Sequence, residues 1–519
     1  MKWMLGAAVT LLAACGGGPP EVQDTRPNIV MILADDIGYS DVGAYGGEIE
    51  TPALDRLAEN GLRFTRYYTN NKCAPTRAAL LTGVYHTLAL DESNTLRREA
   101  VTVTEALRQV GYLTYMTGKW HLSRPEDTEG LPVQRGFGQF FGTIHGAGSY
   151  FAPASLMRNN DGAEGEFARG DFYYTDAISD SAAAFIREAA GTKKAFFVYV
   201  AYTAAHWPLH ALEEDVAKYR GRYARGWDAL RRERHERMKA RGVVNPDWPL
   251  SPRHPDVPAW ERAPHKEWQQ RRMEVYAAQI DRMDRGIGRI VRALEETGKL
   301  ENTLIVFQSD NGGCHVEYAP DRKGPYLPER TRDRRPVRPG NLPAVMPGGE
   351  DTYQSYGYGW ANASNTPFRL FKQFDHEGGI RTPLIAHWPA KIKGGGITDQ
   401  VAHVTDLAPT FLDVAEARQP RTYQGRRVLE MDGTTLMPVF EGERRRGHGA
   451  LFFKWARGRA VRREQWKLVS ADGGAWELYD IEADGTELKN LAKERPFEAQ
   501  QLEALWKAWD ALTVEQRLR

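Results

Sequence analysis

The chain has few cysteines. Only Cys15, Cys73 and Cys314 occur among 519 residues. This scarcity excludes a small scaffold held together by disulfides, so the fold must depend on its hydrophobic core. A disulfide between Cys73 and Cys314 stays open as an alternative if the chain is exported to an oxidising compartment.

The chain also has little net charge and no internal repeat. Its 69 Lys and Arg balance 68 Asp and Glu, which leaves +1. No overall field therefore favours nucleic acid or a membrane surface. We interpret the arginines within 330–338 as solvated loop charge, with contact to an anionic polymer as the alternative. A chain of this length can bury a large core, and we expect two domains.

The N-terminus carries an apolar run, but not a long one. Lys2 precedes residues 4–14, which are too few to cross a bilayer as a helix and are typical of a secretion signal. Residues 12–15, Leu-Ala-Ala-Cys, resemble a bacterial lipobox, in which Cys15 becomes a lipid-modified N-terminus. The alternative is an ordinary signal peptide with an incidental Cys. We predict a signal peptide over 1–14 and a tether over 15–25, with the protein anchored by lipid in the bacterial periplasm or at the cell surface.

Oxygen donors follow two predicted buried strands. The apolar run 29–33 leads into Asp35 and Asp36, and the run 304–309 leads into Asp310 and Asn311. In open α/β sheets, ligands gather at the carboxyl ends of strands. Three carboxylates and one amide suit calcium or magnesium better than zinc. The alternative is a solvated turn after each strand.

Other strands end in basic or imidazole side chains. The strand-like segment 112–117 precedes Lys119 and His121, which would point the same way in an extended chain, and the buried run 195–202 precedes His206. The alternatives are that Lys119 and His121 are surface residues without a function and that His206 has a structural role. A further strand is predicted at 383–387, and helices are predicted at 54–62, 103–110, 179–190 and 275–297. This order predicts an α/β fold with a mostly parallel sheet between helices.

Two regions lie outside this pattern. Residues 213–275 are charged and broken by Pro and Trp, which indicates a surface insertion, and 320–365 predict a long loop facing the substrate. After residue 425, short runs separated by turns predict a four-stranded antiparallel sheet, closed by a helix over 497–512. We therefore expect a catalytic domain over 26–424 and a smaller C-terminal domain over 425–519.

The stretch from Cys73 to Gly83 reads Cys-Ala-Pro-Thr-Arg-Ala-Ala-Leu-Leu-Thr-Gly. Pro75 suits the first turn of a helix and Gly83 suits its end. Cys73 should therefore lie at a helix N-terminus, which favours anions, with Arg77 one turn further on. A buried structural Cys before a helix is the alternative.

This stretch resembles the signature of the type I sulfatases, and residues 111–121 resemble the second signature of that family. Lys372, five residues before Glu377-Gly-Gly, matches a third motif. The resemblance runs from Pro27 into the C-terminal domain. It implies an alkaline-phosphatase-like fold and hydrolysis of sulfate monoesters of aryl or carbohydrate alcohols.

The resemblance also implies a cofactor set. Cys73 would be oxidised by a maturation enzyme to formylglycine (3-oxoalanine), whose hydrate attacks sulfur and forms a covalent sulfo-enzyme. The implied calcium ligands are Asp35, Asp36, residue 73, Asp310 and Asn311.

Five further side chains receive implied roles. Arg77 and Lys119 would hold residue 73 and its charge, and His121 would take a proton from the second hydroxyl of the hydrate. His206 and Lys372 would bind sulfate and assist the leaving group. Among partners, the resemblance implies a sulfated small molecule or glycan and the maturation enzyme. From the charge balance and the lipobox-like segment we expect no nucleic-acid partner, and membrane contact only through Cys15.

One segment departs from the family. Many related sulfatases read His-Glu-Gly-Asn-Arg-Ala in the C-terminal sheet, where this chain reads Trp-Ala-Arg-Gly-Arg-Ala over 455–460. If that segment touches substrate, we expect a specificity that differs from theirs. A phosphomonoester or phosphonate-ester hydrolase of the same superfamily and a non-catalytic lipoprotein that binds sulfated glycan are the competing interpretations.

Overall fold

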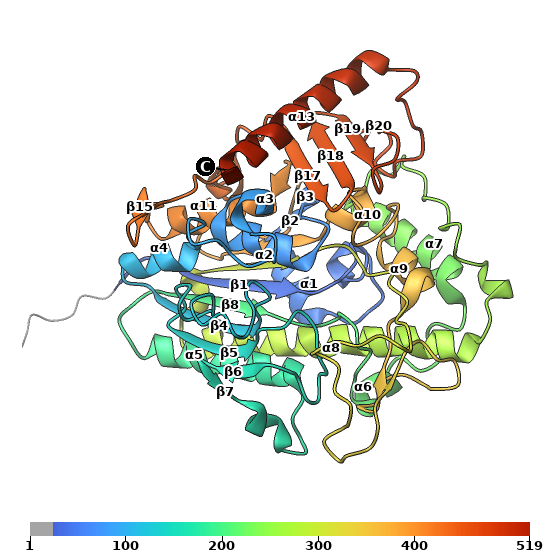
Figure 1. The fold of residues 1–519 in the computed structure, drawn as a ribbon, viewed down its shortest axis with the longest axis horizontal. Coiled ribbons are helices and arrows are strands. Elements are labelled where there is room, and N and C mark those ends of the chain that lie inside the picture. The colour runs from blue at the N-terminus through green and yellow to red at the C-terminus, as the bar shows by residue number, and fades with distance from the viewer. Residues whose placement is uncertain (1–23, 519) are drawn as a thin grey trace, which may run out of the picture.

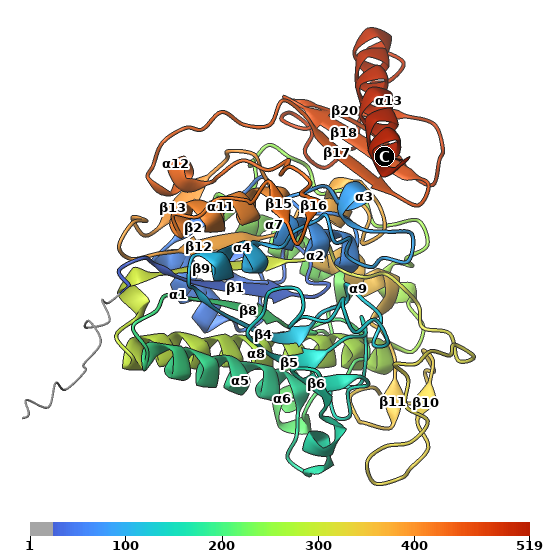
Figure 2. The same cartoon turned by 60° about the vertical axis from the view of Figure 1, so that its left-hand side comes forward.

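The computed structural model describes residues 24–518, so the predicted signal peptide and Cys15 lie outside the described residues. Within them, a ten-stranded sheet forms the centre of the larger domain (Figures 1 and 2). Its strands, in spatial order, are β13 (Gly396–Thr398), β2 (Leu62–Phe64), β12 (Leu384–His387), β9 (Thr303–Ser309), β1 (Asn28–Ala34), β8 (Phe196–Ala201), β4 (Leu113–Lys119), β5 (Gln139–Thr143), β6 (Leu156–Arg158) and β7 (Asp161–Gly162).

The middle of this sheet is parallel. Strands β9, β1, β8, β4 and β5 run in one direction, whereas β12 and β6 pair antiparallel to this group. In β1, Ile32 lies between Phe307 of β9 and Val200 of β8. A strand covered on both faces needs a continuous apolar run, and residues 29–33 are fully buried. Burying each such side chain is worth about 2 kcal/mol.

Helices cover both faces of the sheet, as predicted. Val30 and Ile32 face the side of α1 (Pro52–Glu59), α5 (Tyr174–Ala190) and α8 (Lys266–Glu296). Ile29, Met31 and Leu33 face the side of α2 (Cys73–Thr82), α4 (Val103–Gln109) and α11 (Leu407–Val414). Figure 2 shows the two helical layers above and below the strands. The alternation follows from the two-residue period of a strand.

The region 213–275 differs from the predicted surface insertion. It holds α6 (Glu213–Ala217) and α7 (Gly226–Ala240), and α8 begins within it. Trp227 and Trp260 are buried, with ring centroids 4.7 Å apart, and both contact Trp360. The aromatic residues that interrupt the charged sequence therefore extend the core.

Several predicted helices have other boundaries. The helix predicted from 179 begins at Tyr174, and the closing helix predicted to end at 512 ends at Leu518. The helix predicted over 54–62 ends at Glu59, and Leu62 already belongs to β2 because the chain turns at Gly61. The helix predicted from 275 begins at Lys266. The shorter remaining elements are α3 (His86–Ala89), α9 (Gly357–Ser364), α10 (Glu377–Ile380), α12 (Met437–Phe440), β3 (Tyr67–Tyr68), β10 (Arg338–Pro339), β11 (Thr352–Tyr353), β14 (Ala402–His403), β15 (Thr422–Tyr423) and β16 (Arg426–Arg427).

The predicted C-terminal sheet and helix are confirmed. The antiparallel strands are β17 (Leu451–Trp455), β18 (Gly458–Arg463), β19 (Trp466–Ser470) and β20 (Glu477–Asp480), followed by α13 (Pro496–Leu518). Leu502 and Trp506 of α13 pack on one face of this sheet. The other face packs on Tyr68 and Ile380 of the larger domain.

A buried ionic network joins the two domains. Lys467 of β19 places Nζ 2.8 Å from Oε1 of Glu377 and 2.8 Å from Oε1 of Glu487, and all three side chains are fully buried. Tyr68 Oη and Arg381 donate to the other oxygen of Glu377. Burial alone would raise the pKa of Glu377, but the charges of Lys467 and Arg381 outweigh it and lower the pKa to about 2.

We expect Lys467→Met to lower the free energy of unfolding by about 3–5 kcal/mol, because it removes the cation that two buried carboxylates share and leaves Glu487 without it. Urea unfolding followed by tryptophan fluorescence measures this. Lys489→Met is the matched control, since its pair with Glu494 is exposed and should cost less than about 1 kcal/mol. Equal unfolding midpoints for the two variants would contradict the proposed role of the network.

Candidate active site

The predicted oxygen donors converge at one edge of the sheet. Asp35 and Asp36 follow β1, and Asp310 and Asn311 follow the neighbouring parallel strand β9, so both pairs emerge side by side. The Asp36 backbone N–H donates to Oδ1 of Asp310 at 3.1 Å, and Asn311 Nδ2 donates to Oδ1 of Asp36 at 2.6 Å. Asp36 has a φ of 62°, a left-handed conformation that Asp tolerates better than most residues.

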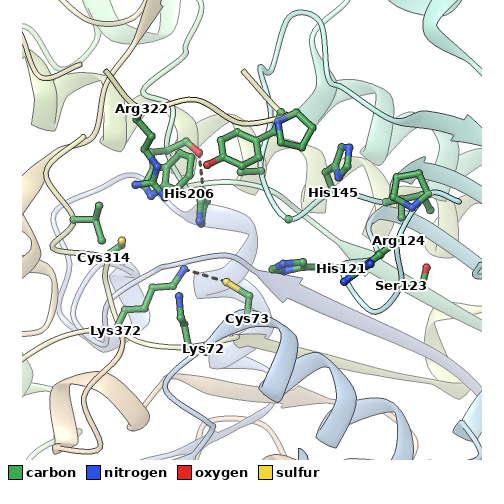
Figure 3. Close-up of a pocket in the computed structure, with 18 of the residues that line it drawn as sticks. Lys72, Cys73, His121, Ser123, Arg124, His145, His206, Cys314, Arg322 and Lys372 are labelled. Carbon is green, nitrogen blue, oxygen red and sulfur yellow. Dashed lines mark hydrogen bonds between the residues drawn. The ribbon is translucent and has the colours of Figure 1, made fainter. Parts of the chain in front are cut away.

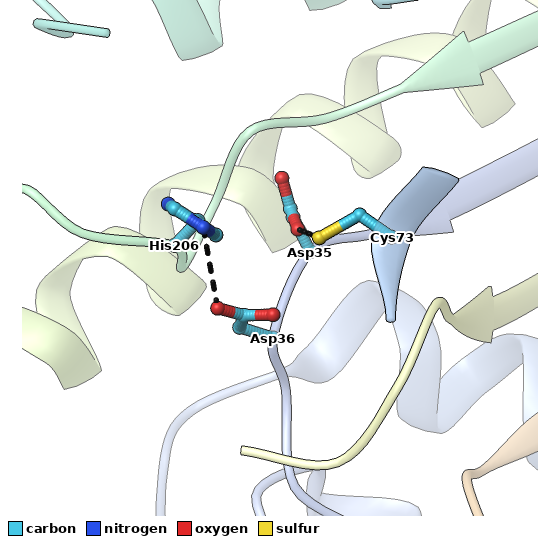
Figure 4. A group of neighbouring side chains, drawn as sticks. All are labelled: Asp35, Asp36, Cys73 and His206. Atoms are coloured by element: carbon cyan, nitrogen blue, oxygen red, sulfur yellow. Dashed lines mark hydrogen bonds and ion pairs between the residues drawn. The ribbon is translucent and has the colours of Figure 1, made fainter. Parts of the chain in front are cut away.

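Cys73 is the first residue of α2, as predicted, and α2 ends at Gly83 with a φ of 71°. The Cys73 thiol lies 3.5 Å from Oδ1 of Asp35, and Lys372 Nζ lies 3.0 Å from its sulfur (Figures 3 and 4). Burial, followed by the charge of Asp310, raises the pKa of Cys73 to about 12. The thiol is therefore protonated at neutral pH and is a poor nucleophile.

Three buried cations neutralise the three carboxylates. Lys119 Nζ lies 2.6 Å from Oδ2 of Asp35, and Lys372 Nζ lies 2.6 Å from Oδ1 of Asp36. Arg77 contacts Oδ2 of Asp310 at 3.2 Å and donates to the Lys119 carbonyl. Each of these side chains is buried.

The carboxylates differ in their proton affinity. Burial, together with the negative charge of Asp35, raises the pKa of Asp310 to about 7. Burial would also raise the pKa of Asp35, but Lys119 and His206 outweigh it and lower the pKa below its ordinary value. A cation among these groups would hold all of them ionised.

His206 lies close to the carboxylates. It follows β8, and its Nε2 is 3.5 Å from Oδ2 of Asp36 (Figure 4). Its Nδ1 lies 2.7 Å from the Trp207 carbonyl, which favours the tautomer protonated at Nδ1. Burial lowers the pKa of His206 to about 4. The neutral ring then directs a lone pair toward a carboxylate, an arrangement that a cation between them would stabilise.

His121 does not adopt the extended conformation that the sequence predicted. Its φ is 60°, so the side-chain alternation ends after Lys119. Lys119 points to Asp35, whereas His121 lines the cavity above Cys73 (Figure 3). Burial, followed by the charge of Lys119, lowers the pKa of His121 well below its ordinary value, so the ring is neutral. Gly146 packs directly against it, since a Cβ there would lie 2.3 Å from Nε2 of His121.

The residues present fit a hard divalent cation. Asp35, Asp36, Cys73 and His206 each offer one atom, and these atoms lie within 4.8 Å of one another. Among the described residues, Oδ2 of Asp36 and Oδ1 of Asn311 are buried and accept no hydrogen bond. Free buried oxygens are costly unless they bind a cation or water. The sequence analysis named His206 as a site residue that binds sulfate, but it did not predict the contact with Asp36, because only the pairing of β8 with β1 brings them together.

A cavity of about 660 Å³ opens above Cys73 (Figure 3). Lys72, His121, His206 and Lys372 are among the side chains that line it, and Lys72, Lys372 and Cys73 form its floor in the view of Figure 3. Arg322, Pro325 and Tyr326 line it, so this part of the predicted loop faces the cavity. The sequence analysis did not single out other lining residues, namely Arg124, His145, Trp207 and Arg322, and no local motif marks them.

The divergent segment 455–460 forms the turn between β17 and β18. Trp455 reaches the site indirectly, because Nζ of Lys72 lies 5.6 Å from the centroid of its ring and Lys72 lines the cavity. The C-terminal domain therefore supports the floor of the cavity.

Comparison with known families assigns both parts of the chain. A sulfatase family model matches residues 27–417. The C-terminal model of N-sulphoglucosamine sulphohydrolase matches residues 368–513. The two matches overlap around Lys372 and the buried Glu377.

Individual relatives agree with this assignment. An arylsulfatase of Klebsiella aerogenes is 33% identical and covers 84% of this chain and 97% of its own length. An N-acetylglucosamine-6-O-sulfatase of Bacteroides thetaiotaomicron is 27% identical and covers 97% and 89%. The crystal structure of Ps i-CgsB with k-i-k-neocarrahexaose has a TM-score of 0.67 and 26% identity over 93% of each chain. The chain therefore belongs to the sulfatase family, has its alkaline-phosphatase-like fold, and is a sulfuric ester hydrolase.

Proposed function

We propose that the protein hydrolyses sulfate monoesters of aryl or carbohydrate alcohols, with residue 73 oxidised to formylglycine and calcium bound beside it. The observation that carries this proposal is the position of Cys73. It begins α2, and its sulfur contacts both Asp35 and Lys372. The names of the arylsulfatase and N-acetylglucosamine-6-O-sulfatase relatives support the two substrate classes.

The environment of Cys73 indicates that this residue must be oxidised before it can act as the nucleophile. A protonated thiol with a pKa of about 12 neither attacks sulfur readily nor suits a hard cation. As a hydrated aldehyde, made by a maturation enzyme, residue 73 supplies an oxygen nucleophile that is activated by its surroundings. The helix N-terminus adds a partial positive charge where negative charge develops.

Asp35, Asp36, Asp310 and Asn311 would hold calcium together with residue 73. The ion supplies Lewis acidity, which polarises a sulfate oxygen and lowers the pKa of a hydroxyl. The carboxylates carry three negative charges, and Arg77, Lys119 and Lys372 carry three positive charges. A divalent cation therefore leaves an excess of two positive charges, which suits binding of a sulfate group.

The remaining residues bind the sulfate group, transfer protons and hold the carboxylates in place. Lys372 and His206 lie against the sulfate oxygens and assist departure of the ester oxygen, to which the Lys372 ammonium gives the proton with which it leaves as the alcohol. His121 is neutral and lines the cavity, so it can accept a proton from the second hydroxyl at position 73. Lys119 and Arg77 hold the carboxylates beneath. The overall reaction consumes one water, breaks the S–O bond and releases alcohol and inorganic sulfate.

We also propose export to the bacterial periplasm or cell surface, with a lipid anchor at Cys15. The residues that support it precede the described part of the chain. Of the helices between residues 24 and 518, none combines the length and apolarity that a membrane span requires.

Mass analysis of the peptide that contains residue 73 tests the proposed nucleophile. In protein made with a maturation enzyme, we expect an aldehyde at residue 73 and an unmodified thiol at Cys314, which serves as the internal control. Release of sulfate should follow the aldehyde fraction and should exceed release of phosphate from the matched aryl phosphate. An unmodified Cys73 in fully active protein, or dominant phosphatase activity, would overturn the proposal.

Gly146→Ala tests the position of His121. The added Cβ must displace the imidazole, and we expect kcat to fall by up to about a hundredfold, as for other small misplacements of a catalytic group. Gly148→Ala is the matched control, because its Cβ would meet its nearest neighbour at an ordinary 3.5 Å. Equal kcat values for the two variants would exclude a proton-transfer role that depends on this ring position.

Removal of divalent cations with EGTA tests the metal. We expect loss of sulfate release and a lower Tm, both restored by calcium, because a ligand at a hundred times its Kd stabilises the fold by about 2.7 kcal/mol. Asp36→Asn should weaken the calcium-dependent rise in Tm. If neither activity nor Tm responds to EGTA or to added calcium, the carboxylate cluster is not a calcium site.

A further inference from the structure

One wall of the cavity is built from aromatic rings. Trp207 lies 5.1 Å from Tyr318 and 5.8 Å from Tyr326, measured between ring centroids, and Tyr353 packs behind them. Trp207 follows His206, whereas the three tyrosines come from the long segment between β9 and α9. Trp207 and Tyr326 line the cavity. Trp207, Tyr318 and Tyr326 are called the aromatic wall below.

Arg322 lies over two rings of this wall. Its guanidinium carbon lies 5.0 Å from the ring centroids of both Trp207 and Tyr318. Arg322 also lines the cavity, where Figure 3 shows it on the side of His206 and Cys314. Within residues 24–518 it has no ion pair and no side-chain hydrogen bond. Stacking on two rings restrains a side chain that is otherwise costly to order, and it leaves the hydrogen-bond donors free.

Trp207 connects Arg322 to the reaction centre. The centroid of its ring lies 4.4 Å from the His206 ring centroid and 5.0 Å from the guanidinium carbon of Arg322. A ring that carries the scissile sulfate near His206 and Lys372 would therefore contact the aromatic wall. A second substituent on that ring, or on the next one, would reach Arg322.

The charge of the cavity favours an anionic substituent there. The lining side chains include Lys72, Arg124, Arg322 and Lys372, against a single carboxylate, Glu126. Lys372 is already paired with Asp36, and Lys72 lies over Trp455. A concave site lined by one sign of charge attracts oppositely charged ligands. The planar donor fork of Arg suits a carboxylate or sulfate in two-point contact.

We propose that Arg322 and the aromatic wall select sulfate esters whose ring-shaped alcohol part carries a second anionic group, either a carboxylate or another sulfate. The proposal rests on the proposed sulfatase function and specifies its substrate class. Trp207 and Tyr326 contact the ring, and Arg322 binds the second anion. Arg322 is a specificity residue, because it lies away from the bond that breaks.

Two matched substrate pairs test this selectivity. The first pair is the sulfate ester of meta-hydroxybenzoate and that of its methyl ester. The second pair is resorcinol disulfate and the monosulfate of resorcinol methyl ether. Each pair keeps the aromatic ring and changes the second anion, and the two pairs distinguish a carboxylate from a sulfate. Release of inorganic sulfate gives kcat and KM for every substrate.

For the wild type we expect kcat/KM to favour the anionic member of at least one pair by about tenfold, the size expected for one charge-assisted contact. In Arg322→Met that ratio should fall toward one, mainly through KM. Arg322→Lys should keep part of the preference, because it keeps the charge and loses the planar fork. Arg322→Gln provides a second neutral variant if Arg322→Met folds poorly.

Lys323→Met is the control for long-range attraction. It removes the same charge from the next residue, which is exposed and, unlike Arg322, does not line the cavity above Cys73, and it should keep the wild-type ratio. The proposal is overturned if the wild type prefers neither anionic member, or if both neutral Arg322 variants keep the preference. If the protein releases sulfate from none of the four esters, the proposed sulfatase function is overturned instead.

Discussion

The structure depends on neutralising the negative charges of three carboxylates that lie close together in a buried site. Asp35, Asp36 and Asp310 meet because two parallel strands end side by side, and burial penalises their charges. Arg77, Lys119 and Lys372 each contact one of them. These ion pairs fix the position of α2, of the end of β4 and of the segment around Lys372, so the charge balance also determines the shape of the floor of the cavity.

The C-terminal domain contributes to this arrangement through the segment that carries Lys372. Asp375 accepts a hydrogen bond from Asn71, two residues before Cys73, at 2.6 Å. The Gln373 backbone N–H donates to the Asn71 carbonyl at 2.8 Å. Glu377, in the same segment, is held by Lys467 of the C-terminal sheet. The smaller domain is thus connected, through buried contacts, to Asn71, two residues before the proposed nucleophile.

Much of the fold was predictable because its signals are local. The apolar runs at 29–33, 195–202 and 304–309 are strands, and the stretch from Cys73 to Gly83 is one helix with the predicted ends. The region 213–275 was not predictable in the same way. Its charges indicate a surface, and only the tertiary packing of Trp227 and Trp260 against Trp360 makes it part of the core.

The sequence by itself determined which chemical groups are available and which strand or helix end presents them, because motif spacing and strand ends are properties of neighbouring residues. It therefore indicated Asp35, Asp36, Cys73, Asp310, Asn311 and Lys372 as members of one site. Only the tertiary structure decided the conformation of His121, the approach of His206 to Asp36, and the stacking of Arg322 on Trp207 and Tyr318. These features depend on contacts between segments far apart in the chain, which no local pattern encodes.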